Sequence, residues 1–227
     1  MLKIKAWRPK TKVGAQKLKF KNFVFDCDST LTQVEGLDEL ASIKGLNGQV
    51  CALTKFAMDG FLTFNESFVQ RVDLIKPTQK ELEDLALKYM QKKVRGVGTL
   101  VTLIKKRGGN VFILSGGIKT VLDIFGRHIG VPDKNIFGCE LSFLQNGEFG
   151  GLVENGLFLF GKAAILKKIA ATGPTVFVGD GFNDLEAANA CDLFIGFGGV
   201  VERAVVKKTV KNYYSGKDLT GLMAFFV

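Results

Sequence analysis

The chain has 227 residues, 47% of them hydrophobic, so it can bury a sizeable core and is too apolar for a disordered protein. No apolar run approaches the roughly 20 residues that a membrane-spanning helix needs, and the first 21 residues lack the apolar block of a secretory signal. The four cysteines are widely spaced without a C-x-x-C pair, which argues against a zinc site or a disulfide framework and favours a cytoplasmic protein.

The net charge of +9 is concentrated at the start of the chain. Residues 1–25 hold eight basic residues and no acidic one, so the remainder is close to neutral. Such an arm can contact nucleic acid or an acidic partner, or it can be a solvated tail. Only Trp7 and Phe20 interleave with its basic residues, so we favour the tail and expect no nucleic-acid partner.

The first predicted strand leads into two carboxylates. The apolar run at 23–25 predicts a strand buried on both faces, and Asp26 follows it directly. Ligands bind at the carboxyl ends of strands in open α/β sheets. Asp26 and Asp28 lie two residues apart, which suits a nucleophile beside a separate acid–base group. The alternative is an Asx turn that only ends the strand.

Residues 34–93 are predicted to be helical throughout. Asn65 fits a helix N-cap, and Thr78 with Glu81 fits a capping box. The predicted helices span 35–46, 50–58, 65–75 and 78–92. With no strand in this stretch, we expect a helical cap inserted after the first strand.

Strands and helices alternate after residue 93, which predicts an α/β fold with a Rossmann-like, doubly wound parallel sheet. The Asn146-Gly147 pair inside an alternating run predicts a hairpin. The predicted strands are 110–114, 175–178, 193–195 and a last edge strand at 209–213, and the helices are 97–106, 118–129, 162–171 and 185–190. We therefore expect a basic arm (1–16), a core domain (17–33 and 94–227) and a cap (34–93).

Polar residues lie at three predicted strand ends and at one helix start. They are Asp26 with Asp28, Ser115 with two glycines, Asp180 with Asn183 and Asp184, and Lys162. Because parallel strands end at one edge of a sheet, these groups can converge. Clustered carboxylates without His or Cys favour Mg²⁺, Ser115 and glycine amides suit an oxyanion, and Lys162 adds positive charge. The set suits phosphoryl transfer.

The order and spacing of these motifs resemble the haloacid dehalogenase superfamily, and further matches narrow the resemblance to the phosphoserine phosphatase family. The superfamily motifs are Asp26-x-Asp28-x-Thr30, Ser115-Gly116-Gly117, Lys162 and Gly179-Asp180-Gly181-x-Asn183-Asp184. The narrower matches are 35–41, 57–60, Phe64, Arg71 and 195–199. The resemblance covers roughly residues 22–215 and leaves out the basic arm.

The resemblance implies a Mg²⁺-dependent phosphatase of serine biosynthesis that releases L-serine and phosphate from phosphoserine. It makes Asp26 the nucleophile that becomes an aspartyl phosphate, and Asp28 the group that protonates the leaving oxygen and then activates water. It places Mg²⁺ on Asp26, the Asp28 backbone carbonyl and Asp180, with Asp184 supporting the metal site.

The resemblance also assigns the substrate contacts. Glu35 would take the substrate ammonium and Arg71 its carboxylate, a group that Arg can bind with two parallel hydrogen bonds. The other implied contacts are Ser115 and Lys162 to phosphoryl oxygens, Met58, Phe64 and Gly116 along the pocket, and Asn183 and Arg203 as supporting polar groups.

Alternatives stay open for the substrate and for single residues. Asp59 departs from the family pattern, and its charge would disfavour a carboxylate-bearing substrate if it faced the pocket. Glu35 could be a first-turn acid that favours the helix dipole, and Arg71 a surface ion pair. The chain could act on another small phosphomonoester or transfer phosphate to an acceptor, or bind an acidic partner through its arm. A homodimer is also open.

Overall fold

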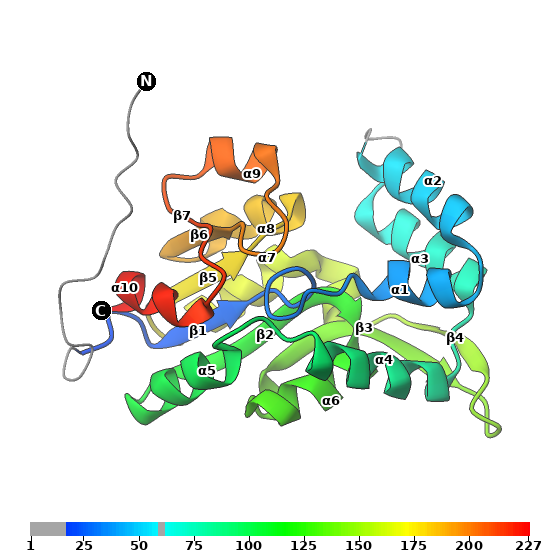
Figure 1. The fold of residues 1–227 in the computed structure, drawn as a ribbon, viewed down its shortest axis with the longest axis horizontal. Coiled ribbons are helices and arrows are strands. Elements are labelled where there is room, and N and C mark those ends of the chain that lie inside the picture. The colour runs from blue at the N-terminus through cyan, green and yellow to red at the C-terminus, as the bar shows by residue number, and fades with distance from the viewer. Residues whose placement is uncertain (1–16, 59–61) are drawn as a thin grey trace.

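A mostly parallel sheet forms the centre of the molecule (Figure 1). The computed structural model describes residues 17–58 and 62–227, and over these residues seven strands lie in the order β4-β3-β2-β1-β5-β6-β7. Only the β3–β4 pair is antiparallel. The strands are β1 (Asn22–Phe25), β2 (Asn110–Ile118), β3 (Ile136–Phe143), β4 (Phe149–Val153), β5 (Thr175–Gly179), β6 (Leu193–Phe197) and β7 (Tyr213–Tyr214). Since β1 is central and later strands extend the sheet on both sides, the predicted doubly wound topology is confirmed.

Helices account for most of the remaining described chain. The α-helices are α1 (Gly36–Ile43), α2 (Asn47–Met58), α3 (Phe64–Ile75), α4 (Gln79–Gln91), α5 (Val97–Lys106), α6 (Lys119–Ile129), α7 (Gly156–Ala170), α8 (Phe182–Ala187), α9 (Ala204–Thr209) and α10 (Met223–Phe226). Short 3₁₀ turns are η1 (Asp133–Asn135), η2 (Ala188–Ala190) and η3 (Leu219–Leu222). None of the helices in the described ranges is long and apolar enough to cross a bilayer.

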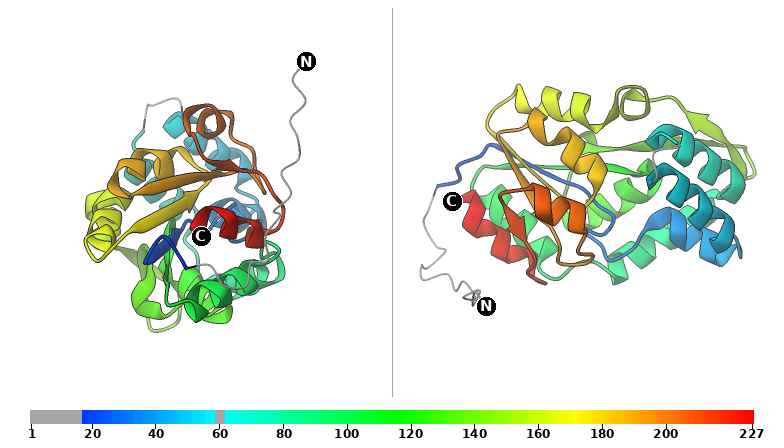
Figure 2. Two further views of the ribbon diagram at one scale, coloured as in Figure 1. Left: turned by 90° about the vertical axis from the view of Figure 1, so that its left-hand side faces the viewer. Right: turned by 90° about the horizontal axis from the view of Figure 1, so that it is seen from above.

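The sheet is covered on both faces, which explains the continuous apolar sequence of its central strand. Helices α5 and α6 lie on one face, and α7 and α8 lie on the other (Figure 2). Phe23, Val24 and Phe25 are fully buried between these layers. At the amino end of β1, the ring of Phe226 packs on Phe23 with 4.9 Å between centroids.

Helices α1, α2 and α3 pack on one another beyond the carboxyl ends of the strands (Figure 1), whereas α4 lies against α6 and also contacts α1. The chain leaves and re-enters the sheet region at one place. There, Gln33 N donates to the Lys92 carbonyl and Val94 N donates to the Leu31 carbonyl, each at 2.9 Å. The two connecting segments are thus bonded to each other through a short antiparallel ladder.

Several predicted boundaries need correction. Thr63, not Asn65, caps α3, because its side chain accepts from Glu66 N and Glu66 returns a bond to the Thr63 backbone. The predicted edge strand at 209–213 is mostly wrong: residues up to Thr209 finish α9, and β7 is only Tyr213–Tyr214.

Other elements are longer than predicted. Helix α7 begins six residues before Lys162 and continues through a kink at Gly161, whose φ of 73° is left-handed and suits glycine. Strand β2 extends through Ile118, with a register shift after Leu114. The predicted capping box at Thr78 and the hairpin between β3 and β4 are confirmed.

Candidate active site

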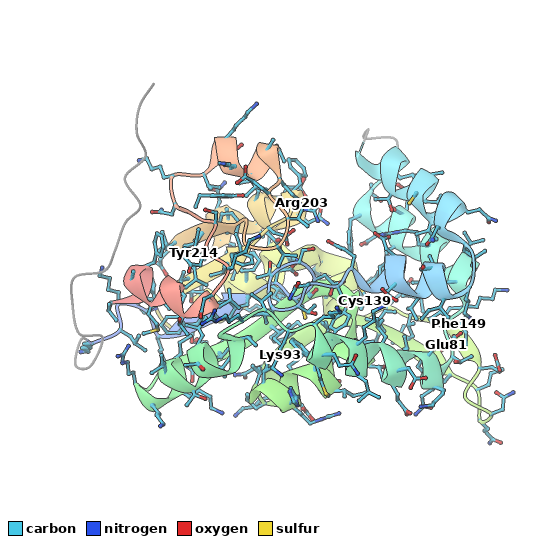
Figure 3. The ribbon with its side chains drawn as sticks, viewed as in Figure 1. Glu81, Lys93, Cys139, Phe149, Arg203 and Tyr214 are labelled. Carbon is cyan, nitrogen blue, oxygen red and sulfur yellow. The ribbon has the colours of Figure 1, made fainter. Side chains whose placement is uncertain are left out.

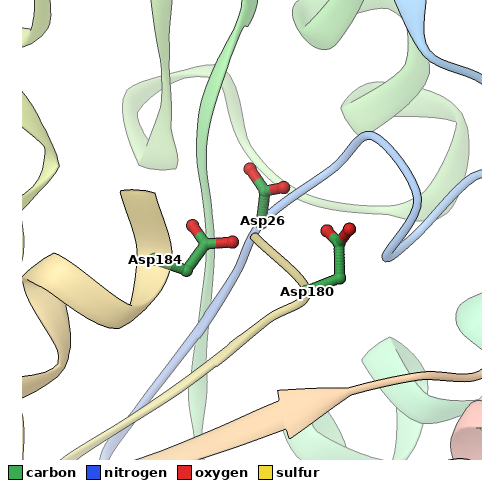
Figure 4. Close-up of side chains that lie close together, drawn as sticks. All are labelled: Asp26, Asp180 and Asp184. Atoms are coloured by element: carbon green, nitrogen blue, oxygen red, sulfur yellow. The ribbon is translucent and has the colours of Figure 1, made fainter. Parts of the chain in front are cut away.

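Three buried carboxylates meet at the carboxyl edge of the sheet (Figure 4). Asp26 follows β1, Asp180 follows β5, and Asp184 lies in the first turn of α8. The parallel ladder continues past β1, since Asp26 N donates to the Val178 carbonyl at 2.9 Å, and this brings the two strand ends together. One oxygen of each carboxylate lies within 4.8 Å of the others. The predicted convergence of these acids is therefore present.

Two cations partly balance this acidic cluster. Lys162 Nζ donates to Asp26 Oδ1 at 2.7 Å and to Asp184 Oδ1 at 2.6 Å. Burial would lower the pKa of Lys162, but Asp184 and Asp26 outweigh it and hold that pKa above its ordinary value. Arg203 Nε donates to Asp180 Oδ2 at 2.8 Å (Figure 3 places Arg203 on the side that faces α1–α3).

The cluster fits a small divalent cation. Burial, and then the charge of Asp26, raise the pKa of both Asp180 and Asp184, so a cation among the three carboxylates would favour their ionised forms. Its donors are all carboxylate oxygens, which hard cations prefer. Lys162, Arg203, the Thr30 hydroxyl and the Gly181 amide together donate to five of the six oxygens, all but Asp26 Oδ2. Because a carboxylate oxygen has two lone pairs, each of these oxygens can still bind a metal ion.

Asp28 lies apart from the three acids and is held by two helices. Its Oδ1 accepts from the Tyr89 hydroxyl at 2.6 Å, and its Oδ2 accepts from Gly36 N at 2.8 Å. Burial, followed by the charge of Glu35, raises the pKa of Asp28 to about 8. The raised pKa favours the protonated carboxyl group, which can give a proton to a leaving group.

Ser115 and its two glycines lie beside Asp28. Ser115 is buried, and its Oγ accepts from Gly117 N at 3.2 Å. A Cβ at Gly117 would lie 3.4 Å from Ser115 Oγ and 3.6 Å from Asp28 Oδ1. A Cβ at Gly116 would lie only 2.6 Å from the Phe64 ring, so a side chain there would displace this residue of α3. The Ser-Gly-Gly sequence thus lets the strand end approach both Asp28 and Phe64.

A cavity of about 200 Å³ opens beside Lys162. Four residues predicted as substrate contacts line it, namely Phe64, Gly116, Lys162 and Asn183. Asn65 also lines it, and its Nδ2 donates to the Phe158 carbonyl at 2.7 Å, which ties α3 to α7.

The two residues predicted to bind the amino-acid part of a substrate differ in their bonding. Glu35 Oε1 accepts from Ser29 Oγ at 2.7 Å and from Arg203 Nη2 at 2.9 Å. Arg71 Nε donates to the carbonyl of Ser67, in its own helix, at 3.2 Å. Among the described residues Arg71 forms no ion pair, and burial lowers its pKa against the opposing charges of nearby carboxylates. Its guanidinium therefore has donors left for a ligand.

Two further predictions concern side chains that the structure does not describe. The side chain of Met58 and all of Asp59 lie outside the described residues. Conversely, Tyr89 and Ser29 bond to the site residues Asp28 and Glu35, and the sequence did not predict either contact. Tyr89 is 61 residues from Asp28, and neither a motif nor a periodicity marks it as more than a core residue of α4.

Comparison with known proteins agrees with this geometry. The family model of haloacid dehalogenase-like hydrolases matches residues 20–192. Phosphoserine phosphatase of Bos taurus is 34% identical over 198 residues, which is 83% of this chain and 86% of that protein. The solved structure of a substrate-bound phosphoserine phosphatase complex is 27% identical, with a TM-score of 0.78, and the match covers 94% of this chain and all of that one.

A second solved structure, a phospho-aspartyl intermediate analogue of phosphoserine phosphatase, is 28% identical with the same TM-score over 93% of this chain and all of that one. The acids that follow β1 and β5, the Ser-Gly-Gly sequence near the end of β2 and the lysine of α7 occur in the order that the superfamily resemblance requires. The chain therefore belongs to the haloacid dehalogenase-like hydrolases and, within them, to the phosphoserine phosphatase family.

Proposed function

We propose that this protein is a Mg²⁺-dependent phosphoserine phosphatase that uses Asp26 as its nucleophile. The observation that carries the proposal is the buried group of Asp26, Asp180 and Asp184 with Lys162, placed at the carboxyl edge of the sheet near Asp28, whose pKa is raised by burial. In phosphoryl transfer, positioning and charge neutralisation provide most of the rate enhancement, and this group supplies both.

The metal would sit on Asp26, Asp180, Asp184 and the backbone carbonyl of Asp28, where it would neutralise charge on the phosphoryl group. Lys162, whose ammonium is already fixed between Asp26 and Asp184, would hold a phosphoryl oxygen. Ser115 and the amides that follow it would hold another.

Two steps complete the reaction. In the first, an oxygen of Asp26 bonds to phosphorus, the bond from phosphorus to the serine oxygen breaks, and the proton of Asp28 moves to that oxygen. In the second, a water oxygen bonds to phosphorus, its proton moves to the Asp28 carboxylate, and the bond to Asp26 breaks. L-Serine leaves after the first step and inorganic phosphate after the second.

The substrate assignment rests on Arg71 and Glu35 together with the 34% identity to the bovine enzyme. A half-buried guanidinium without an ion pair in the described chain suits a carboxylate, which it can bind through two hydrogen bonds. The Glu35 oxygen that Ser29 and Arg203 leave free suits an ammonium. Residues 34–93 would act as the cap that carries both groups, with Met58, Phe64 and Gly116 along the pocket and Asn183 and Arg203 in supporting contacts.

We also propose that the protein is cytoplasmic. The four cysteines are free thiols, which suits the reducing cytoplasm. The partner is a small-molecule phosphomonoester. A homodimer and the role of the basic arm stay predictions from the sequence.

The test is a phosphate-release assay with Mg²⁺ over a panel of small phosphomonoesters, including O-phospho-L-serine, phosphothreonine and phosphoethanolamine. We expect the highest kcat/KM for phosphoserine, and no release above background from an Asp26→Asn variant. Release from other substrates in preference to phosphoserine would favour a related phosphatase, and no release from any of them would contradict the proposal.

A further inference from the structure

The hydroxyl of Tyr89 is a buried polar group that the reaction scheme above does not use. Tyr89 is 1% exposed, and its ring packs edge-on against Phe125 with centroids 5.8 Å apart. The hydroxyl donates to Asp28 Oδ1 at 2.6 Å, across 61 residues of sequence. A phenylalanine would fill this position equally well, so packing alone does not account for the oxygen.

The surroundings are shaped to admit that hydroxyl. Gly36 begins α1, and a Cβ there would collide with the Tyr89 hydroxyl. The Gly36 amide meanwhile donates to the other oxygen of Asp28 at 2.8 Å. One donor from α4 and one from α1 therefore hold the two carboxyl oxygens, and two fixed points define both the position and the plane of the group.

The oxygen that Tyr89 holds is also next to the proposed phosphoryl-binding turn. A Cβ at Gly117 would lie 3.6 Å from Asp28 Oδ1 and 3.4 Å from Ser115 Oγ. Loss of the Tyr89 bond would thus free the carboxyl group to rotate where a phosphoryl group and its leaving oxygen would lie. General acid catalysis needs the acid within hydrogen-bonding reach of that oxygen.

We propose that Tyr89 is a positioning residue for proton transfer by Asp28. It orients the carboxyl group through the 2.6 Å hydrogen bond, keeps its own proton throughout, and does not touch the substrate. The inference rests on the proposed function, because it assumes that Asp28 protonates the leaving oxygen.

A substitution with two matched substrates tests this role. Tyr89→Phe removes only the hydroxyl and keeps the ring contact with Phe125. O-Phospho-L-serine leaves as an alcohol that needs a proton, whereas S-phospho-L-cysteine leaves as a thiol with a pKa of about 8.5 and needs little help. The quantity to compare is kcat/KM, which reports the steps up to departure of the leaving group.

We expect Tyr89→Phe to lower kcat/KM for phosphoserine by about 10-fold, a part of the ~10²- to 10⁴-fold that a general acid contributes, since the Gly36 amide still holds Oδ2. For S-phosphocysteine we expect less than about a 2-fold loss. Equal losses on both substrates would show a merely structural role, and no loss on phosphoserine would also overturn the inference. Failure of the unaltered protein to release phosphate from phosphoserine would instead count against the proposed function.

Tyr214→Phe is the matched control. It removes a phenol that donates to the Asp218 carbonyl at 2.5 Å, and Figure 3 shows Tyr214 near α10, well away from α1–α4. This variant should leave the ratio of the two kcat/KM values unchanged. A change in that ratio as large as the one expected for Tyr89→Phe would mean that the ratio does not report on Asp28, and would overturn the inference.

Discussion

The acidic centre and the side of the site formed by α1–α3 differ in how their charges are paired. At the centre, Asp26, Asp180 and Asp184 each bond to Lys162 or Arg203 at 2.6–2.8 Å. On the side of α1–α3, Arg71 is half-buried, donates to a carbonyl of its own helix and forms no ion pair within the described residues. The carboxylates proposed for chemistry are thus held in place before a ligand binds, whereas Arg71, proposed for substrate recognition, still has hydrogen-bond donors available for a ligand. We expect changes at the centre to affect every substrate and changes in the cap to depend on the substrate.

The largest effect should come from Asp26→Asn. A carboxamide is a poor nucleophile and no described neighbour can replace it, so we expect kcat to fall by on the order of 10⁴-fold or more on all substrates. Phosphate release measures the loss, and circular dichroism checks the fold. Asp123→Asn, which only loosens an ion pair with Lys119 on α6, is the control and should retain activity. Substantial turnover by Asp26→Asn would exclude the aspartyl-phosphate route.

Removal of divalent metal should have the next largest effect on activity. We expect protein dialysed against EDTA to lose phosphatase activity on every substrate, Mg²⁺ to restore it, and Ca²⁺ to fail. Ca²⁺ takes more ligands at longer distances than Mg²⁺ and would misplace the nucleophile. Titration of the dialysed protein with each ion, followed by phosphate release, makes the measurement. Full turnover in EDTA would mean that the three carboxylates do not serve as a metal site.

Arg71→Ala should have a smaller and selective effect. Loss of a hydrogen bond to a charged group costs about 1.5–3 kcal/mol, which is on the order of a 10- to 100-fold loss in kcat/KM for phosphoserine. Phosphoethanolamine lacks the carboxylate, so its kcat/KM should change little. Arg127→Ala, which breaks a surface ion pair with Asp133, is the control. If kcat/KM falls equally for both substrates, Arg71 has only a structural role. If the unaltered protein has a higher kcat/KM for phosphoethanolamine than for phosphoserine, the phosphoserine assignment fails and the phosphatase assignment stands.

The smallest effect should come from Asn65→Ala, which removes the 2.7 Å bond between α3 and the Phe158 carbonyl. A bond of this kind contributes about 0.5–1.5 kcal/mol, so we expect KM for phosphoserine to rise by about 2- to 10-fold. Asn135→Ala removes a similar bond, from η1 to the Val111 carbonyl in the core, and should leave KM unchanged. A larger KM change for Asn135→Ala than for Asn65→Ala would contradict the expectation that α3, and not η1, affects substrate binding.

The sequence was informative where local rules determine the outcome. Asp26 and Asp180 were predicted to converge because each follows an apolar strand, and parallel strands end at one edge. Thr78 was predicted as a cap because its partner Glu81 lies three residues away. Where two local signals compete, prediction failed: Thr63 and Asn65 are both good N-caps, and only the returned bond from Glu66 selects Thr63.

Side-chain contacts between separate helices and loops could not be predicted. The bond from Tyr89 to Asp28 joins residues that are far apart in sequence. The need for glycine at position 36, where a Cβ would collide with the Tyr89 hydroxyl, is visible only in the folded structure. The start of α7 was missed because Gly161 normally ends a helix, yet here it joins two helical segments across a kink. The charge state of Asp28 likewise depends on burial, which no local pattern encodes.

The bonded ladder between the two connecting segments has a mechanical consequence. Thr32 pairs with Lys93, and the amides of Gln33 and Val94 bond across the same pair of segments. A two-stranded connection resists twisting and stretching more than a single strand does, so α1–α3 would move relative to the sheet chiefly by bending about the ladder. Asp28 and Gly36 lie within a few residues of that pivot. Opening would therefore change the distance between Arg71 and the acidic centre far more than the geometry around the Asp28 carboxyl group.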